Sequence, residues 1–187
     1  MKTKTGMVNN KMMAWHYTRG HGYREIIKSG FLKCADAGIT KNEKPVLWFS
    51  INQLWEPTVN GAELVDGGKT IKFLTMFETW ESQGCFRFGI PSNHLIPWIE
   101  LKKIANIPSK IKKGLEISAL EIGSNPYQWY GCMQPMDITG MVIEVMKDFG
   151  KWQSTGDLGQ QAYSESLLFD EAHYADQGAQ TAYFECV

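Results

Sequence analysis

Hydrophobic and polar positions follow short, changing patterns along this chain, which predict short strands interrupted by helices. Met13–Thr18 is brief and aromatic and predicts a strand. Tyr23, Ile26 and Ile27 then stand at i, i+3 and i+4, which is the spacing of a helix with one apolar face. Gly30 follows them, and glycine is the residue that most often ends a helix. The first third of the chain therefore predicts a strand followed by a short helix.

Further elements follow at similar spacing. Continuous apolar residues after a proline predict a strand at Pro45–Ser50, and alternation predicts another at Cys85–Pro91. Two later strands are predicted at the stretches YQWYGCMQPM and MVIEVM. A helical turn ended by Pro57 is predicted at INQLWEPT, and a turn is predicted at DGGK. Ser109–Ile122 places its apolar residues on one helical face. Together these elements predict an α+β fold.

The chain divides by composition into three parts. Residues 1–12 form a polar N-terminal arm, residues 13–150 carry the predicted strands and helices, and residues 151–187 form an acidic C-terminal extension that we expect to pack on the domain. A length of 187 residues fits one domain with such additions. The hydrophobic content of 43% is enough for a packed core and excludes global disorder.

Charge is unevenly distributed although the net charge is only −1. Residues 1–44 hold nine Lys and Arg against three Asp and Glu, whereas residues 152–187 hold six acids and no Lys or Arg. The basic part suits a surface that faces an anionic substrate, and an ordinary solvated face is the simpler alternative.

The four cysteines are far apart in sequence, at Cys34, Cys85, Cys132 and Cys186, which predicts free thiols. No cluster of cysteine, histidine and carboxylate residues has the spacing of a metal site, so we expect no metal. The N-terminus lacks the apolar core of a signal peptide, and no apolar run is long enough to span a membrane. We therefore expect a soluble cytoplasmic protein with no membrane partner.

One run combines residues that suit a binding site: His16, Tyr17 and Thr18, followed by the short helix and by SGFL. A second stretch, VLWFS, ends in an aromatic residue and a serine. In this order and spacing the two stretches resemble the ADP-ribosyltransferase superfamily. The resemblance covers roughly residues 13–146 and is strongest to the branch with a histidine on its first strand, which includes DNA-modifying toxins and enzymes like poly-ADP-ribose polymerases.

The resemblance implies a fold of split antiparallel β-sheets that form an NAD cleft, with helices on the flanks. It implies that His16 binds a ribose of NAD, that aromatic residues stack on nicotinamide, and that nearby polar residues place the phosphates. The residues expected at such an NAD site are His16, Tyr17, Thr18, Arg19, Trp48, Phe49, Ser50 and Arg87.

The acid of the superfamily is missing at its expected place. Most members carry a glutamate on a later strand, and by spacing that position falls in NPYQWYGCMQPM, where this chain has Gln128. An amide can bond a hydroxyl group but cannot supply a negative charge. Glu144, in VIEV, is an alternative acid, and Glu165 is a third option. The expected catalytic residues are therefore His16, Gln128 and Glu144.

The resemblance implies an NAD-dependent mono-ADP-ribosyltransferase that modifies a macromolecule, of the kind found among bacterial and phage toxins and defence proteins. Nucleic acid is slightly favoured over protein as the acceptor because of the basic N-terminal third, and an antitoxin or inhibitor is a possible partner. Two alternatives remain open. One is a binding module that holds a nucleotide or a partner without catalysis, and the other is an NAD-dependent RNA 2′-phosphotransferase.

Overall fold

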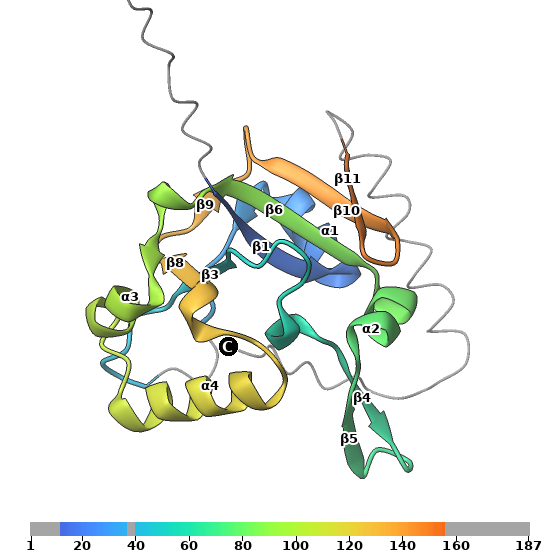
Figure 1. Ribbon diagram of the computed structural model, residues 1–187, viewed down its shortest axis with the longest axis horizontal. Helices are drawn as coiled ribbons and strands as arrows, with labels where there is room; N and C mark the ends of the chain where they lie inside the picture. Colours follow the sequence, from blue (N-terminus) through green and yellow to red (C-terminus); the bar gives the residue numbers. More distant parts are fainter. Residues whose placement is uncertain (1–11, 37–39, 156–187) are drawn as a thin grey trace, which may run out of the picture.

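A computed structural model describes residues 12–36 and 40–155 of the chain. Its centre is a seven-stranded antiparallel sheet in the order β11-β10-β6-β1-β3-β8-β7, and two separate two-stranded sheets pair β2 with β9 and β4 with β5 (Figure 1). The strands of the large sheet are β1 (Met13–Arg19), β3 (Leu47–Ser50), β6 (Cys85–Pro91), β7 (Ile96–Pro97), β8 (Trp129–Cys132), β10 (Val142–Asp148) and β11 (Lys151–Ser154). The small sheets contain β2 (Phe31–Leu32), β9 (Met136–Asp137), β4 (Ala62–Val65) and β5 (Thr70–Phe73).

Four α-helices and three short 3₁₀ helices surround the sheet within the described residues. They are α1 (Gly20–Ser29), α2 (Met76–Gln83), α3 (Trp98–Ile104), α4 (Ser109–Glu121), η1 (Pro57–Val59), η2 (Ser92–His94) and η3 (Pro126–Gln128). The predicted α+β class is therefore confirmed. None of the described helices is long and apolar enough to cross a membrane.

Most predicted elements are present near their expected bounds. The first helix ends as predicted, because Gly30 adopts a left-handed conformation (φ 75°) and its N–H bonds the carbonyl of Ile26. One prediction is wrong: INQLWEPT does not form a helical turn ended by Pro57. Instead, Pro57 opens η1, where its fixed φ and missing N–H suit the first helical position, and Glu56 caps that turn.

Strand β11 was not predicted. It lies within the segment assigned to the C-terminal extension, yet it pairs with β10 at the edge of the main sheet. The remainder of that extension, including Glu165, lies outside the described residues, as do most of the N-terminal arm and Cys186. Cys34, Cys85 and Cys132 are free thiols, as predicted.

Alternation along the strands gives the large sheet two different faces. The first, which we call the His16 face, carries Ala14, His16, Phe49, Phe86 and Phe88. Helix α1 covers part of this face from behind the sheet as drawn in Figure 1, and its Tyr23 ring stacks on Phe86 at 4.2 Å. Burial of these large rings makes the His16 face the main hydrophobic core.

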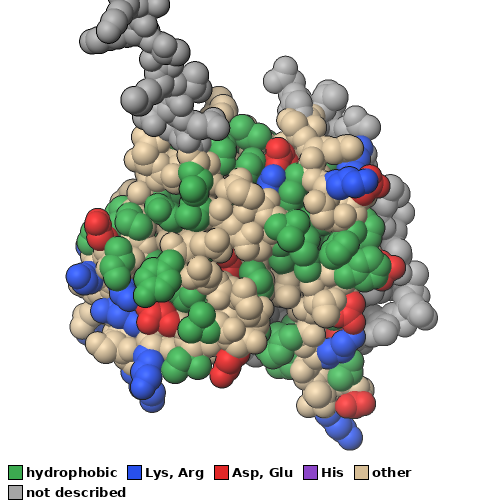
Figure 2. Space-filling view, viewed as in Figure 1, with side chains coloured by type: hydrophobic (Ala, Val, Ile, Leu, Met, Phe, Trp, Pro, Cys, Tyr) green, Lys and Arg blue, Asp and Glu red, His purple; other side chains and the backbone are tan. Residues whose placement is uncertain are grey.

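The second face, which we call the Arg87 face, carries Trp15, Tyr17, Arg87 and Glu144. The loop after β3 lies on it, α3 and α4 cover its β3–β8 end, and α2 covers its β10–β11 end. Figure 2 looks onto this side of the molecule, and no histidine side chain is seen on it. The sheet thus separates the protein into two layers with different chemistry.

Candidate functional site

His16 lies in the middle of β1, between β6 and β3. Its Nδ1 is 2.9 Å from the carbonyl oxygen of Trp48 on β3. A carbonyl oxygen can only accept, so Nδ1 carries the proton and Nε2 is left as an acceptor. The bond therefore fixes both the ring orientation and the tautomer.

The surroundings of His16 keep the ring neutral. Desolvation by burial lowers the pKa of the imidazole from its usual value of 6.5, and the bond to Trp48 opposes this only in part. The side chain is nevertheless partly exposed. Its Nε2 has no hydrogen-bond partner among the described residues and can accept a bond from a ligand or from water.

A row of side chains crosses the His16 face at this level. The strand registers pair His16 with Phe88 and Phe49 with Tyr130, and the His16 and Phe49 rings meet edge to face with centroids 5.8 Å apart. Phe49 is buried, whereas Tyr130 is partly exposed. We call His16, Phe49 and Tyr130 the His16 row, which spans the neighbouring strands β1, β3 and β8.

Two polar groups near this row have no partner in the described part of the chain. The Tyr130 hydroxyl makes no hydrogen bond with any described residue, and neither does the side-chain amide of Gln128. Gln128 ends η3 directly before β8, and its backbone carbonyl accepts a bond of 2.9 Å from the N–H of Ile51. Thr18 is on the His16 face, and its hydroxyl lies against Gly22 of α1. A side chain at position 22 would clash with that hydroxyl.

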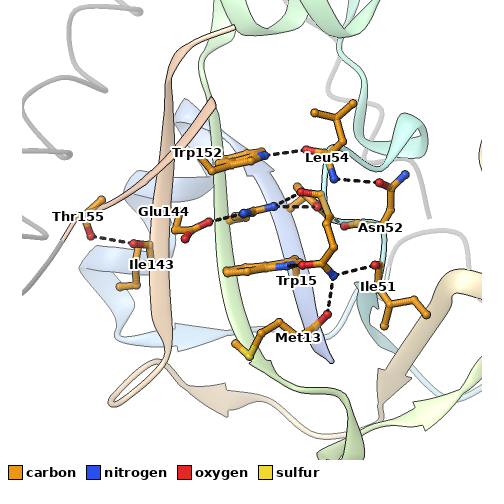
Figure 3. Close-up of polar contacts among 12 residues, drawn as sticks. Met13, Trp15, Ile51, Asn52, Leu54, Ile143, Glu144, Trp152 and Thr155 are labelled. Atoms are coloured by element: carbon orange, nitrogen blue, oxygen red, sulfur yellow. Dashed lines mark hydrogen bonds and ion pairs between the residues drawn. The ribbon is translucent and has the colours of Figure 1, made fainter. Parts of the chain in front are cut away.

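The other expected site residues lie on the Arg87 face, where they are engaged with one another. The Arg87 guanidinium is stacked between the rings of Trp15 and Trp152, 3.8 and 4.2 Å from their centroids (Figure 3). Its Nε donates to Glu144 over 2.7 Å, and Nη1 donates to the Gln53 carbonyl over 2.6 Å. Gly89 leaves the space that the Trp15 ring occupies.

This network ties the loop after β3 to the sheet. The Tyr17 hydroxyl donates to the carbonyl oxygen of Asn52, and burial raises the pKa of Tyr17 to about 12. Trp152 donates from its indole nitrogen to the Leu54 carbonyl over 2.7 Å, which holds β11 against the same loop (Figure 3). Glu144 is therefore the charge partner of a buried arginine, on the opposite face of the sheet from His16.

Arg19, Trp48 and Ser50 also belong to the Arg87 face. Arg19 donates to the side chain of Gln83 at 3.0 Å. Trp48 packs against the indole rings of α3 and β8, and Ser50 is buried and accepts from the Asn52 N–H. Of the expected residues, the structure thus brings together His16, Thr18 and Phe49 on one face of the sheet. It places the others on the opposite face: Tyr17, Arg19, Trp48, Ser50, Arg87 and Glu144.

Sequence reasoning missed two polar residues of interest. Tyr130 stands two positions after Gln128 in the stretch QWY, and strand alternation would have placed it on the His16 face. Glu56 is 4% exposed, and its Oε1 accepts from Ser124 and Thr58, whereas its Oε2 has no hydrogen-bond partner within the described residues. No sequence signal marks Glu56, because Ser124 is 68 positions away.

Comparisons with protein-family models, with curated proteins and with solved structures found no match for this chain.

Proposed function

We propose that this protein is an NAD-dependent mono-ADP-ribosyltransferase that uses the His16 face to bind NAD as co-substrate. In this proposal His16 accepts a hydrogen bond from a ribose hydroxyl through Nε2. The buried Phe49 supports the His16 ring from the side, and Thr18 and Gln128 are the further polar residues proposed for the site. Arg87 and Glu144 then hold the scaffold on the other face.

One observation carries the proposal. The two stretches that carry the family resemblance, which are separated in sequence, lie on adjacent strands and are joined by the bond from His16 Nδ1 to the Trp48 carbonyl. The bond leaves a neutral, partly exposed acceptor at the centre of the sheet. The later strand expected to carry the acid, β8, is the next neighbour of β3. A site built on three adjacent strands is rigid, as a binding site that orients a co-substrate needs to be.

The reaction can be written in full. The bond between ribose C1′ and the nicotinamide nitrogen breaks, and its electron pair leaves with neutral nicotinamide. A nucleophile of the acceptor forms a new bond to C1′, and its proton passes to solvent. Positive charge builds on the ribose in the transition state, as in glycoside hydrolysis, and an enzyme accelerates the step by stabilising that charge.

The assay is nicotinamide release from NAD⁺ by the purified protein, with and without nucleic acid or protein from a cell lysate. We expect release that depends on an acceptor and falls by about a hundredfold or more in His16→Ala. His94→Ala is the matched control because His94 is exposed on η2. Labelled ADP-ribose on nucleic acid would support the favoured acceptor, and labelling of protein would replace it. Equal release by wild type and His16→Ala would refute the proposal.

A second function is favoured by a specific observation: no acidic residue lies on the His16 face of the described strands β1, β3, β6 and β8. Such a site binds a nucleotide more readily than it stabilises a cation. NAD⁺ binding by calorimetry without nicotinamide release would identify a non-catalytic nucleotide-binding module. No observation favours a 2′-phosphotransferase, because such an enzyme is expected to need more site arginines than Arg19 and Arg87 provide, and both of these are bonded on the opposite face.

A further inference from the structure

The position of Tyr130 singles it out on the His16 face. It is directly opposite Phe49 in the β3–β8 register, and Phe49 in turn packs against His16. Tyr130 is partly exposed, and its hydroxyl has no hydrogen-bond partner among residues 12–36 and 40–155. This hydroxyl is not buried, so it is free to donate to a ligand that also reaches His16, two strands away.

We propose that Tyr130 contacts the nicotinamide-side ribose of NAD⁺ and takes the place of the missing glutamate, donating from its hydroxyl while His16 Nε2 accepts. This inference rests on the proposed function, since it names a residue of the same site. It assigns to Tyr130 the contact that the spacing argument had assigned to Gln128.

The spacing of the row fits this role. His16 and Tyr130 are two strands apart, and neighbouring strands are about 4.8 Å apart, so their backbones are separated by roughly 10 Å. Phe49 fills the bottom of the interval and is 3% exposed. A sugar ring that bridges the exposed edges of His16 and Tyr130 has hydroxyl groups on its own edge, and each hydroxyl can both donate and accept. One can donate to His16 while another accepts from Tyr130.

The same chemistry limits the rate of the reaction. A neutral hydroxyl group can orient a ribose, but it cannot stabilise positive charge on C1′ as a carboxylate does. The wild-type protein should therefore bind NAD⁺ well and release nicotinamide slowly. A carboxylate introduced at position 130 should increase the rate, whereas a neutral amide of the same shape should not.

The first test compares NAD⁺ affinity by calorimetry in two tyrosine variants. Tyr130→Phe removes only the hydroxyl, and we expect it to weaken NAD⁺ binding by about three- to tenfold. Tyr127→Phe is the matched control, three positions earlier on η3, where the side chain is 83% exposed. We expect this control to bind like wild type. Unchanged binding in Tyr130→Phe would overturn the inference.

The second test measures nicotinamide release in Tyr130→Glu and Tyr130→Gln, with thermal unfolding used to establish that both are folded. We expect release about tenfold or more above wild type in Tyr130→Glu and no increase in Tyr130→Gln. Equal rates in the two variants would overturn the inference. Failure of Tyr130 alone is distinguishable from failure of the proposed function. If only the Tyr130 inference is wrong, wild type still binds NAD⁺ and His16→Ala does not. If the proposed function is wrong, wild type itself does not bind NAD⁺.

Discussion

Arg87 and His16 lie on neighbouring strands, β6 and β1, but their side chains are on opposite faces of the sheet. Arg87 is enclosed by two indole rings, a carboxylate and a carbonyl oxygen, so its charge and its donors are largely satisfied within the protein. His16 has one nitrogen bonded and the other without a partner in the described chain, and on the same face, two strands away, the Tyr130 hydroxyl has no partner there either.

This difference separates residues that hold the fold together from residues available to a ligand. Buried polar groups in proteins are almost always paired, and an exception needs an explanation such as a ligand or water. Around Arg87 the rule is met through contacts between distant segments, whereas His16 and Tyr130 are partly exposed and keep polar atoms without a partner in the described chain, open to solvent or a ligand. Substitutions on the Arg87 face should therefore affect stability, and substitutions on the His16 face should affect binding.

The largest effect is expected at Arg87. Arg87→Ala leaves the half-buried Glu144 without its partner and removes the buried group between Trp15 and Trp152, so the free energy of unfolding should fall by about 3–5 kcal/mol. Urea unfolding monitored by tryptophan fluorescence measures the change. Lys151→Ala is the control, because its contact with Asp148 is exposed and contributes little. A cost no larger than that of Lys151→Ala would mean that the Arg87 network does not stabilise the fold.

Glu56 should show the next largest effect. Glu56→Ala removes the acceptor for Ser124 and Thr58 and disconnects the loop after β3 from the segment before η3. Because buried donors lose their acceptor, we expect the free energy of unfolding to fall by roughly 1–3 kcal/mol. Chemical unfolding of Glu121→Ala, an exposed acid at the end of α4, supplies the comparison. Equal values for the two variants would contradict a structural role for Glu56.

A smaller, pH-dependent effect is expected from His16. Its pKa is lowered in the folded protein, so the unfolded chain binds a proton more readily than the folded one does. The contribution of His16 to stability is therefore complete above pH 6.5 and is lost as the pH falls below 6.5 towards the folded pKa. NAD⁺ affinity should also fall as the pH is lowered through the pKa of His16 in the folded protein, because protonation converts Nε2 from an acceptor to a donor.

Urea unfolding and calorimetry between about pH 7.5 and about pH 5 measure the two parts of this prediction. We expect the free energy of unfolding to fall by about 1.4 kcal/mol per unit of difference between the folded and unfolded pKa of His16. His16→Gln is the control, since an amide does not titrate in this range. If wild type and His16→Gln lost stability and affinity in parallel, the pH dependence would have to come from other groups.

The smallest effect compares two tyrosines on opposite faces. Tyr17→Phe removes the hydroxyl that donates to the Asn52 carbonyl, and we expect the free energy of unfolding to fall by about 1 kcal/mol with NAD⁺ affinity unchanged. Tyr130→Phe should show the reverse pattern. Loss of NAD⁺ affinity in a folded Tyr17→Phe variant would show that the two faces are not functionally separate.

Much of the local structure could be predicted from the sequence because it depends on neighbouring residues. Gly30 ends α1, apolar alternation defines β6, and the proline before Ser109 precedes α4. Alternation along β1 also implies that His16 and Tyr17 face opposite sides of a sheet, although the family resemblance led us to group them. Both the candidate residue His16 and the placement of Tyr17 on the other face could therefore be predicted from the sequence.

The tertiary structure decided which distant groups meet. Glu144 is 57 positions from Arg87, and nothing local distinguishes a carboxylate that pairs with a buried arginine from one that faces a ligand. Likewise, Tyr130 joins the His16 row only because β3 lies between β1 and β8. Strand order and register are set by how whole surfaces pack to bury apolar area, which no short stretch of sequence specifies. The sequence by itself therefore determined the elements and the central histidine, and the packing of the sheet decided which groups stabilise the fold and which remain open to a ligand.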